Sequence, residues 1–189
     1  MRRLVVSMVV SLDGFVEGAD GNPPVPEWSA DLDDWTTEAE RRFDLLIYGH
    51  VAWRQMAAFW PGAANVAGMP PGIAAFAGWM NSVRKCVFSS APVALSDWSG
   101  SARADVSLPD LVARERTRPG QDMVIFAGVT MAQTALRAGL VDEIRLLTVP
   151  LVMGAGRRLF DGPLSGRSLA LTDLRRMDTG AVLSQYRVA

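Results

Sequence analysis

Three expected strands of this 189-residue chain end in small residues of the kind that bind phosphate oxygens. The breaks are Gly49-His50, Ser89-Ser90 and Ala127-Gly128. Ligands of open α/β sheets bind beyond the carboxyl ends of the strands, so we expect these breaks to line one cleft. Backbone N–H groups and serine hydroxyls suit phosphate oxygens, and an arginine could complete such a site. A phosphate-bearing ligand is therefore the first chemical expectation.

The third break opens the most complete unit of this kind. Val124, Ile125 and Phe126 form a short apolar run that suits a buried strand. Thr130 is then expected to cap a helix that runs through Leu136 and stops at Gly139. A glycine between a strand and a helix start presents bare N–H groups to an anion. The alternative is an ordinary turn, because any α/β protein has such turns and the spacing matches neither G-x-G-x-x-G nor a P-loop.

Asp13 is the candidate acid–base residue. It lies in Ser11-Leu-Asp-Gly14, directly after the valine-rich run from Leu4 to Val10, which reads as a buried strand. A carboxylate there could hydrogen-bond a pterin-like or pyrimidine-like amide, or relay a proton if its pKa is raised. The alternative is a turn residue bonded to its own backbone. Residues 17–26 form a long polar loop that could serve as a lid, and Phe15-Val16 is too short to predict a return strand.

The elements that must position these residues alternate along the chain. Strands are expected at 4–10, 44–48, 84–88, 124–126 and 142–149, with a short one within 98–106, and helices at 28–43, 51–59, 73–82, 109–116 and 131–136. This alternation predicts an α/β fold with a mostly parallel central sheet and helices on both faces. Residues 169–177 and 181–188 predict a C-terminal antiparallel hairpin. No linker or repeat divides residues 1–189, so one domain is expected.

Composition narrows the function further. The net charge is −1, so no global field attracts nucleic acid or an anionic membrane. With one cysteine and one histidine, neither a cysteine-based zinc site nor a paired-histidine site is expected, and Cys86 suits an inert buried thiol. We recognise no signal peptide and no membrane-spanning stretch, and therefore expect a cytoplasmic protein.

The chain resembles the dihydrofolate-reductase-like superfamily. Within it, the chain is similar to stand-alone proteins related to the reductase domain of bifunctional riboflavin-biosynthesis enzymes. The likeness runs from Leu4 to Val188, and its motifs are weak singly but specific in their order. The motifs are Ser11-Leu-Asp-Gly14, Asp44-Leu-Leu-Ile-Tyr-Gly49, Trp53 with Phe59-Trp-Pro61, Val87-Phe-Ser-Ser90, Ile125-Phe-Ala-Gly128, Gly139-Leu-Val-Asp-Glu-Ile-Arg-Leu146, Pro150-Leu-Val-Met-Gly-Ala-Gly156 and Leu159-Phe160.

The resemblance implies a three-layer reductase fold, a homodimer and NADPH bound across the carboxyl ends of the strands. It places Gly49, His50 and Val51 along the adenosine side and Ser89-Ser90 beside the ribose 2′-phosphate. The pyrophosphate would be held by Gly128, Val129, Thr130 and Met131. The loop that contains Leu12, Asp13 and Gly14 would cover the nicotinamide.

Three positions depart from the family pattern. His50 stands where the family usually has an arginine, which leaves NADH open as a cofactor unless Arg54 or Arg84 compensates. Ala127 replaces the first glycine of the family's glycine pair, and Phe126 replaces the glutamate before that pair. Riboflavin synthesis is therefore not the expected reaction, and the zinc deaminase signature is missing as well.

The expected function is hydride transfer from NADPH to a small pterin-, folate- or pyrimidine-like heterocycle. Asp13, Trp28, Asp34 and Trp60 are the candidates for contact with this small-molecule substrate. The alternative from a different class is a non-catalytic nucleotide-binding or dimerisation module that keeps the reductase fold.

Overall fold

A computed structural model describes residues 1–95, 97–161 and 168–188. Its strands are β1 (Leu4–Ser11), β2 (Phe15–Gly18), β3 (Phe43–Gly49), β4 (Arg84–Phe88), β5 (Ser101–Arg103), β6 (Asp122–Ile125), β7 (Glu143–Val149), β8 (Gly156–Arg158), β9 (Leu169–Arg176) and β10 (Val182–Val188). Its helices are α1 (Ala30–Arg42), α2 (His50–Ala57), α3 (Trp60–Ala63), α4 (Pro71–Ser82), α5 (Leu108–Arg116) and α6 (Val129–Arg137). The elements expected from the sequence are all present.

Within the described residues, eight strands form the main sheet in the order β5-β4-β3-β6-β1-β7-β10-β9. The strands from β5 to β7 are parallel, and β10 and β9 complete the sheet as an antiparallel hairpin. The central strand β1 alternates between two cores, because Leu4 and Val6 face one side of the sheet and Val5 faces the other. The predicted mostly parallel sheet with a terminal hairpin is confirmed.

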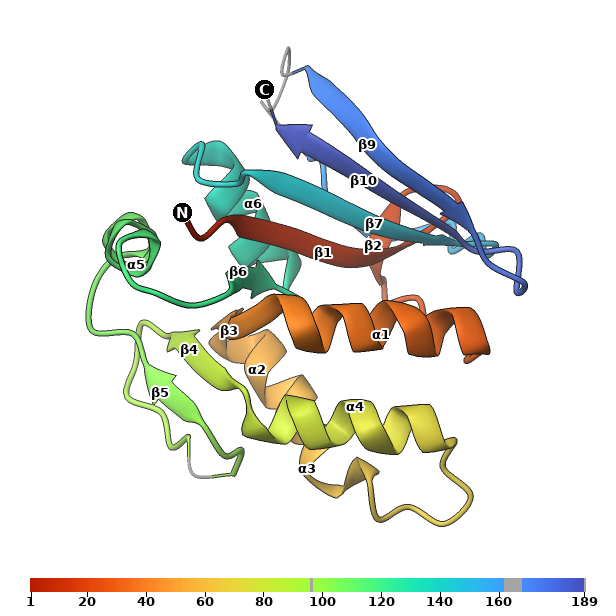
Figure 1. Ribbon diagram of the computed structural model, residues 1–189, viewed down its shortest axis with the longest axis horizontal. Coiled ribbons are helices and arrows are strands. Elements are labelled where there is room, and N and C mark those ends of the chain that lie inside the picture. The colour runs from red at the N-terminus through yellow and green to blue at the C-terminus, as the bar shows by residue number, and fades with distance from the viewer. Residues whose placement is uncertain (96, 162–167, 189) are drawn as a thin grey trace.

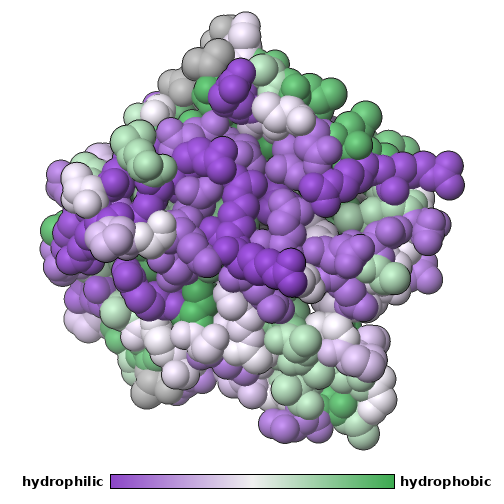
Figure 2. Space-filling view, viewed as in Figure 1, coloured by the Kyte–Doolittle hydropathy of each residue, from purple (hydrophilic) through white to green (hydrophobic). Residues whose placement is uncertain are grey.

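Helices cover both faces of this sheet, which makes three layers (Figure 1). On one face, α1, α2 and α4 bury residues such as Trp35, Trp53 and Phe76. On the other face, α5 and α6 bury Leu111 and Ala132. Figure 2 shows the α1 side of the molecule, which is mostly hydrophilic, with apolar side chains along the rim that β9 forms.

Local sequence signals explain several element ends. The Ser29 side chain accepts a hydrogen bond from the Leu32 N–H, so Ser29 caps α1 as its sequence position predicts. Gly139 follows the end of α6, as expected. Cys86 is buried in β4, and burial raises the pKa of its thiol to about 11, which fits the inert role expected of it.

The sequence does not predict one strand of the structure. Residues from Phe15 do form a strand, β2, although their run is too short to predict one. Its partner is β8, and the two make a small antiparallel sheet of their own. No local pattern reveals this pairing, because the partners lie far apart in the chain. The segment Gly154-Ala-Gly156, at the end of one of the motifs of the resemblance, leads directly into β8.

No helix in the described ranges is long and apolar enough to cross a membrane. The same ranges hold no group of three or more His, Cys, Asp or Glu residues that could bind a metal ion.

Candidate functional site

The carboxyl ends of β3, β4 and β6 lie at the same edge of the sheet because these strands are parallel neighbours. The structure brings the glycine breaks after β3 and β6 together there. A Cβ atom added to Gly49 would lie 4.0 Å from Met131 Cε, and one added to Gly128 would lie 2.9 Å from Ala52 Cβ. The starts of α2 and α6 are therefore in contact.

Neither of these helix starts is capped by a side chain. Gly49 is the N-cap of α2 and Gly128 is the N-cap of α6, and no side-chain hydrogen bond closes either end. In contrast, α1 and α5 are capped by the side chains of Ser29 and Ser107. Helix N-termini carry unsatisfied N–H groups and a partial positive charge, so this corner of the molecule is suited to an anion.

The N-cap of α6 differs from the residue that the sequence predicts. Thr130 is expected there, but the cap is Gly128 and Thr130 lies inside the first turn. Gly128 has φ +94°, a conformation that residues with a side chain rarely adopt, and Ala52 leaves no room for a Cβ atom. The chain can enter α6 two residues earlier because glycine accepts this backbone geometry. Val129 is buried, whereas Thr130 is exposed.

Two arginines that belong to no recognisable sequence motif lie at this edge. Arg157 of β8 donates from Nη2 to Thr130 Oγ1 at 2.8 Å. Arg103 of β5 donates to the Ser89 backbone oxygen at 3.2 Å. Arg157 directly follows Gly154-Ala-Gly156, and this pair of glycines is the only sequence signal for it. Arg103 carries no signal, because its place beside Ser89 depends on the pairing of β4 with β5.

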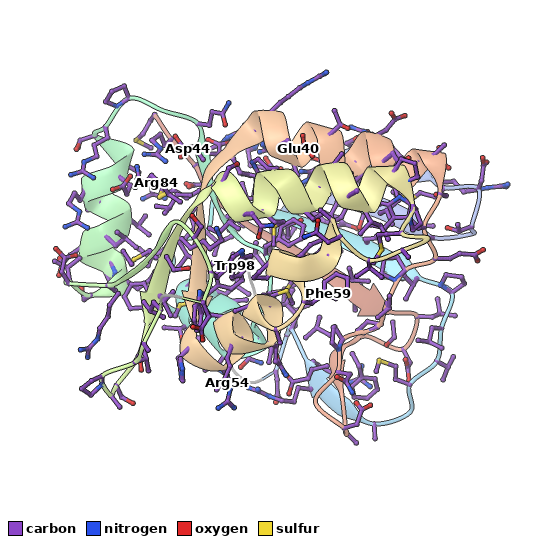
Figure 3. All side chains as sticks on the ribbon, turned by 90° about the horizontal axis from the view of Figure 1, so that it is seen from below. Glu40, Asp44, Arg54, Phe59, Arg84 and Trp98 are labelled. Carbon is purple, nitrogen blue, oxygen red and sulfur yellow. The ribbon has the colours of Figure 1, made fainter. Side chains whose placement is uncertain are left out.

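Of the two arginines named earlier as substitutes for the family residue at position 50, Arg84 lies elsewhere. Arg84 begins β4, at the amino edge of the sheet, and pairs with Glu115 at 3.2 Å. Figure 3 shows Arg84 close to Asp44 and well separated from Arg54, which lies on α2. Arg84 therefore cannot serve a ligand at the carboxyl edge. Arg54 remains on the helix that starts there and is exposed.

The residues expected on the adenosine side differ in exposure. His50 lies in the first turn of α2, and its ring stacks near Trp53 with centroids 6.3 Å apart. Val51 is 63% exposed, which is unusual for valine. The Ser89 hydroxyl donates to the Ala91 oxygen at 2.8 Å, so it shapes its own turn, while Ser90 is exposed.

The loop with Asp13 is tied to the loop after β7. The Asp13 carboxylate accepts hydrogen bonds from Ser11 Oγ at 2.7 Å, from the Met153 N–H at 3.1 Å and from the Gly154 N–H at 2.7 Å. Leu12 N–H also donates to the Leu151 oxygen, at 2.8 Å. These hydrogen bonds, that from Ser11 above all, lower the pKa of Asp13 to about 2. Asp13 is thus ionised at neutral pH, and its carboxylate is bonded to the distant residues 153–154 as well as to its own turn.

The substrate-side candidates do not all gather in one place. Trp60 packs edge-on against Phe76, with centroids 5.2 Å apart, and Phe76 in turn contacts Phe126. Trp28 packs partly against the same core, and its Nε1 donates to Asp33 at 2.6 Å. Asp34 is separate, because it lines a small cavity of about 140 Å³ on the β9 side of α1. Phe126, which takes the place of the family's glutamate, is part of this aromatic group and also contacts Trp35.

This arrangement of a mainly parallel sheet, helices on both faces and a ligand-suited carboxyl edge defines a dihydrofolate-reductase-like α/β protein. The model of the family described as RibD C-terminal domain matches residues 2–183. The chain belongs to the RibD C-terminal domain family. Solved structures with this fold include proteins that are named as reductases.

Individual proteins similar to this chain agree with the assignment. The uncharacterized protein YyaP of Bacillus subtilis (strain 168) is 26% identical over 186 residues, 98% of this chain and 94% of its own length. The structure of a putative riboflavin biosynthesis protein from Shewanella sp. PV-4 superposes with a TM-score of 0.71 at 18% identity, covering 99% of each chain. Dihydrofolate reductase from Enterococcus faecalis complexed with NADP(H) gives a TM-score of 0.62 at 12% identity, covering 98% of this chain and 96% of its own. At these identities, the solved structures support the fold.

Proposed function

We propose that this protein is an NADPH-dependent reductase of a small, flat, nitrogen-containing heterocycle. The observation that carries the proposal is the contact between two uncapped helix starts at Gly49 and Gly128, at the carboxyl edge of a reductase-type sheet. Gly128 keeps open a cradle, which is the space between the starts of α2 and α6, and a Cβ atom at position 128 would fill it. This fits a site where a pyrophosphate approaches the backbone. When bound, the cofactor supplies the hydride, and the chain supplies its position.

In this proposal the chain holds NADPH along the edge described above. Gly49, His50 and Val51 lie along the adenosine, and Gly128 to Met131 hold the pyrophosphate. Leu12 and Gly14 belong to the loop that covers the nicotinamide and excludes water from it. Trp28, Trp60 and Asp34 remain proposed substrate contacts, of which Asp34 is the weakest because it faces another cavity.

Asp13 is proposed to act as an ionised carboxylate. Its pKa is lowered to about 2, whereas a carboxylic acid that donates a proton at neutral pH needs a raised pKa. Asp13 can accept a hydrogen bond from a substrate amide and hold the covering loop to residues 153–154. The same pKa favours the alternative function, a binding module without catalysis, because Asp13 is the catalytic candidate of this chain.

A thermal unfolding experiment with NADPH and NADH tests the proposed function. A ligand that binds only the native state raises the melting temperature, so we expect both nucleotides to do so, with NADPH the stronger. No shift with either nucleotide would refute the cofactor proposal. Turnover is then sought with oxidised pterins, folates and flavins. A shift without turnover of any of them would favour the non-catalytic module.

Arg103 should set the preference for NADPH over NADH. Its guanidinium lies beside Ser89, where the 2′-phosphate is proposed, and hydrogen bonds to charged groups contribute more than neutral ones. We expect Arg103→Ala to raise the Kd of NADPH about tenfold or more and to leave that of NADH within about twofold. Titration calorimetry with both nucleotides measures this. Arg54→Ala is the matched control, and a selective loss in that variant instead would move the role to Arg54.

We also propose that the protein forms a homodimer. Leu169, Leu171 and Leu174 are 39%, 53% and 59% exposed on β9, the edge strand of the sheet, and Figure 2 shows the apolar rim there. Exposed apolar surface on an edge strand is a common site of association between protein chains. Sedimentation of a monomer at micromolar concentration would contradict this proposal.

A further inference from the structure

The small β2–β8 sheet is held together by direct backbone contact. A Cβ atom added to Gly156 would lie 2.0 Å from the Glu17 backbone oxygen and 2.9 Å from the Gly18 Cα atom. Gly156 also has φ +140°. Only glycine fits at such an approach, so β8 lies directly on β2.

This sheet is also fixed to α6. The buried Gln133 donates from Nε2 to the Arg158 backbone oxygen at 2.9 Å. Arg157, next to it, donates to Thr130 Oγ1 in the first turn of α6. Because both contacts hold β8 over the start of α6, the guanidinium of Arg157 has a defined position there.

The two neighbouring arginines of β8 have different roles. Arg158 donates to the Asp13 backbone oxygen at 2.6 Å and lies over the Phe15 ring at 4.2 Å, so it holds the loop that contains Asp13. Arg157 instead faces Glu17, its partner across the strands, at 3.6 Å. These side chains are 47% and 27% exposed, and an ion pair of such length and exposure is weak.

Arg157 is a cation at the positive end of a helix dipole, where cations are disfavoured. The N–H groups of the uncapped first turn and the guanidinium are all hydrogen-bond donors. An anion between them would accept hydrogen bonds from both and offset their repulsion. Glu17 offers one carboxylate to Arg157 from the side of β2.

We propose that Arg157 exchanges its ion pair with Glu17 for the pyrophosphate of the bound nicotinamide nucleotide. Arg157 is then the charged residue that binds the cofactor at α6, and Glu17 competes with the cofactor for it. This inference rests on the proposed function. It adds to the proposed function that Arg157 of β8 supplies affinity for the pyrophosphate and that Glu17 of β2 weakens this affinity.

Titration calorimetry of four variants with NADPH, NADH and inorganic pyrophosphate tests the exchange. Arg157→Gln should raise the Kd of all three ligands about tenfold to a hundredfold, because a charged hydrogen bond is lost. Arg157→Lys should fall between this variant and the wild type, since lysine keeps the charge but not the two-pronged geometry. Glu17→Gln should lower the Kd about two- to fivefold, the size expected for release from an exposed pair. Arg187→Gln removes an exposed arginine at the amino edge of the sheet and should leave the Kd of all three ligands unchanged.

The double variant separates competition from a general effect of charge. In the Arg157→Gln background, Glu17→Gln should no longer lower the Kd, because the arginine for which Glu17 and the cofactor compete is gone. An unchanged Kd in Arg157→Gln, or the same gain from Glu17→Gln in both backgrounds, would overturn the exchange while leaving the cofactor proposal intact. Failure of the wild type to bind any of the three ligands would overturn both proposals together.

Discussion

Gly128→Val is expected to abolish the binding of NADPH and NADH. The valine side chain would occupy the cradle between α2 and α6, where even a Cβ atom lies 2.9 Å from Ala52. It would also force a β-branched residue into φ +94°. Titration calorimetry should show no binding heat, and Gly78→Val is the matched control. Gly78 is exposed on α4 and a Cβ atom there meets nothing within 4 Å, so that variant should bind both nucleotides normally.

The strain of the Gly128 variant also lowers stability, by about 1–3 kcal/mol for such a backbone conformation. Thr130→Asp tests the same placement without strain, because an acidic residue in the first turn of a helix stabilises it. At the cradle, however, the new carboxylate would repel the pyrophosphate by about 4 kcal/mol at a separation of 4 Å. We expect at least a hundredfold loss of NADPH affinity at an unchanged or higher melting temperature. Thr130→Asn is the neutral control, and normal NADPH binding by the aspartate variant would contradict the proposed pyrophosphate site.

Glu115→Ala is expected to lower the free energy of unfolding by about 3–5 kcal/mol, more than Gly128→Val does. The Glu115 side chain is fully buried and accepts hydrogen bonds from Arg2 at 2.7 Å, Arg84 at 3.2 Å and Arg118 at 2.7 Å. Arg2 is itself 3% exposed, so removal of the carboxylate leaves a buried cation with fewer partners. Urea unfolding of the wild type and the variant measures the difference. Asp105→Ala, which removes an exposed partner of Arg114, should cost less than about 1 kcal/mol.

The pH dependence of this loss has a definite sign. Burial alone would raise the pKa of Glu115, but Arg84, Arg118 and Arg2 outweigh it and hold the pKa below its ordinary value of 4.5. The contribution of Glu115 is therefore present above pH 4.5 and disappears as the pH falls through the lowered pKa. The difference in free energy of unfolding between the wild type and Glu115→Ala should become smaller in acid. A gap that stays constant down to about pH 3, well below the ordinary glutamate pKa, would show that the ion pairs do not cause it.

Local signals in the sequence predict most of the fold. The apolar run before Gly49 and the serine before α1 each specify an element through neighbours in the chain. The resemblance to reductases then correctly anticipates the family and the three layers. The glycine breaks at 49 and 128 do meet at one edge, because parallel strands end on the same side.

What the sequence could not show depends on contacts between distant segments. Arg157 and Arg103 reach the site through short strands whose partners no local pattern identifies. Glu115 lies in the last turn of a charged helix, a position where the sequence predicts an exposed side chain. In the structure it is buried and paired with three arginines. The pKa of Asp13 follows from residues 153 and 154 as well as from its neighbour Ser11, and so its role could not be decided from the Asp-Gly turn alone.

The position of β1 between β6 and β7 has a consequence for synthesis of the chain. β1 leaves the ribosome well before its neighbours in the sheet and meets them only after contacts that span 119 and 138 residues can form. At about 5–20 residues per second, its apolar residues wait roughly 6–24 s for β6. The protein therefore has to complete its fold after most of it has been translated, and the apolar residues of β1 stay without their strand partners until then. A ribosome-bound chain halted before Asp122 should be cut readily by protease where the finished protein resists.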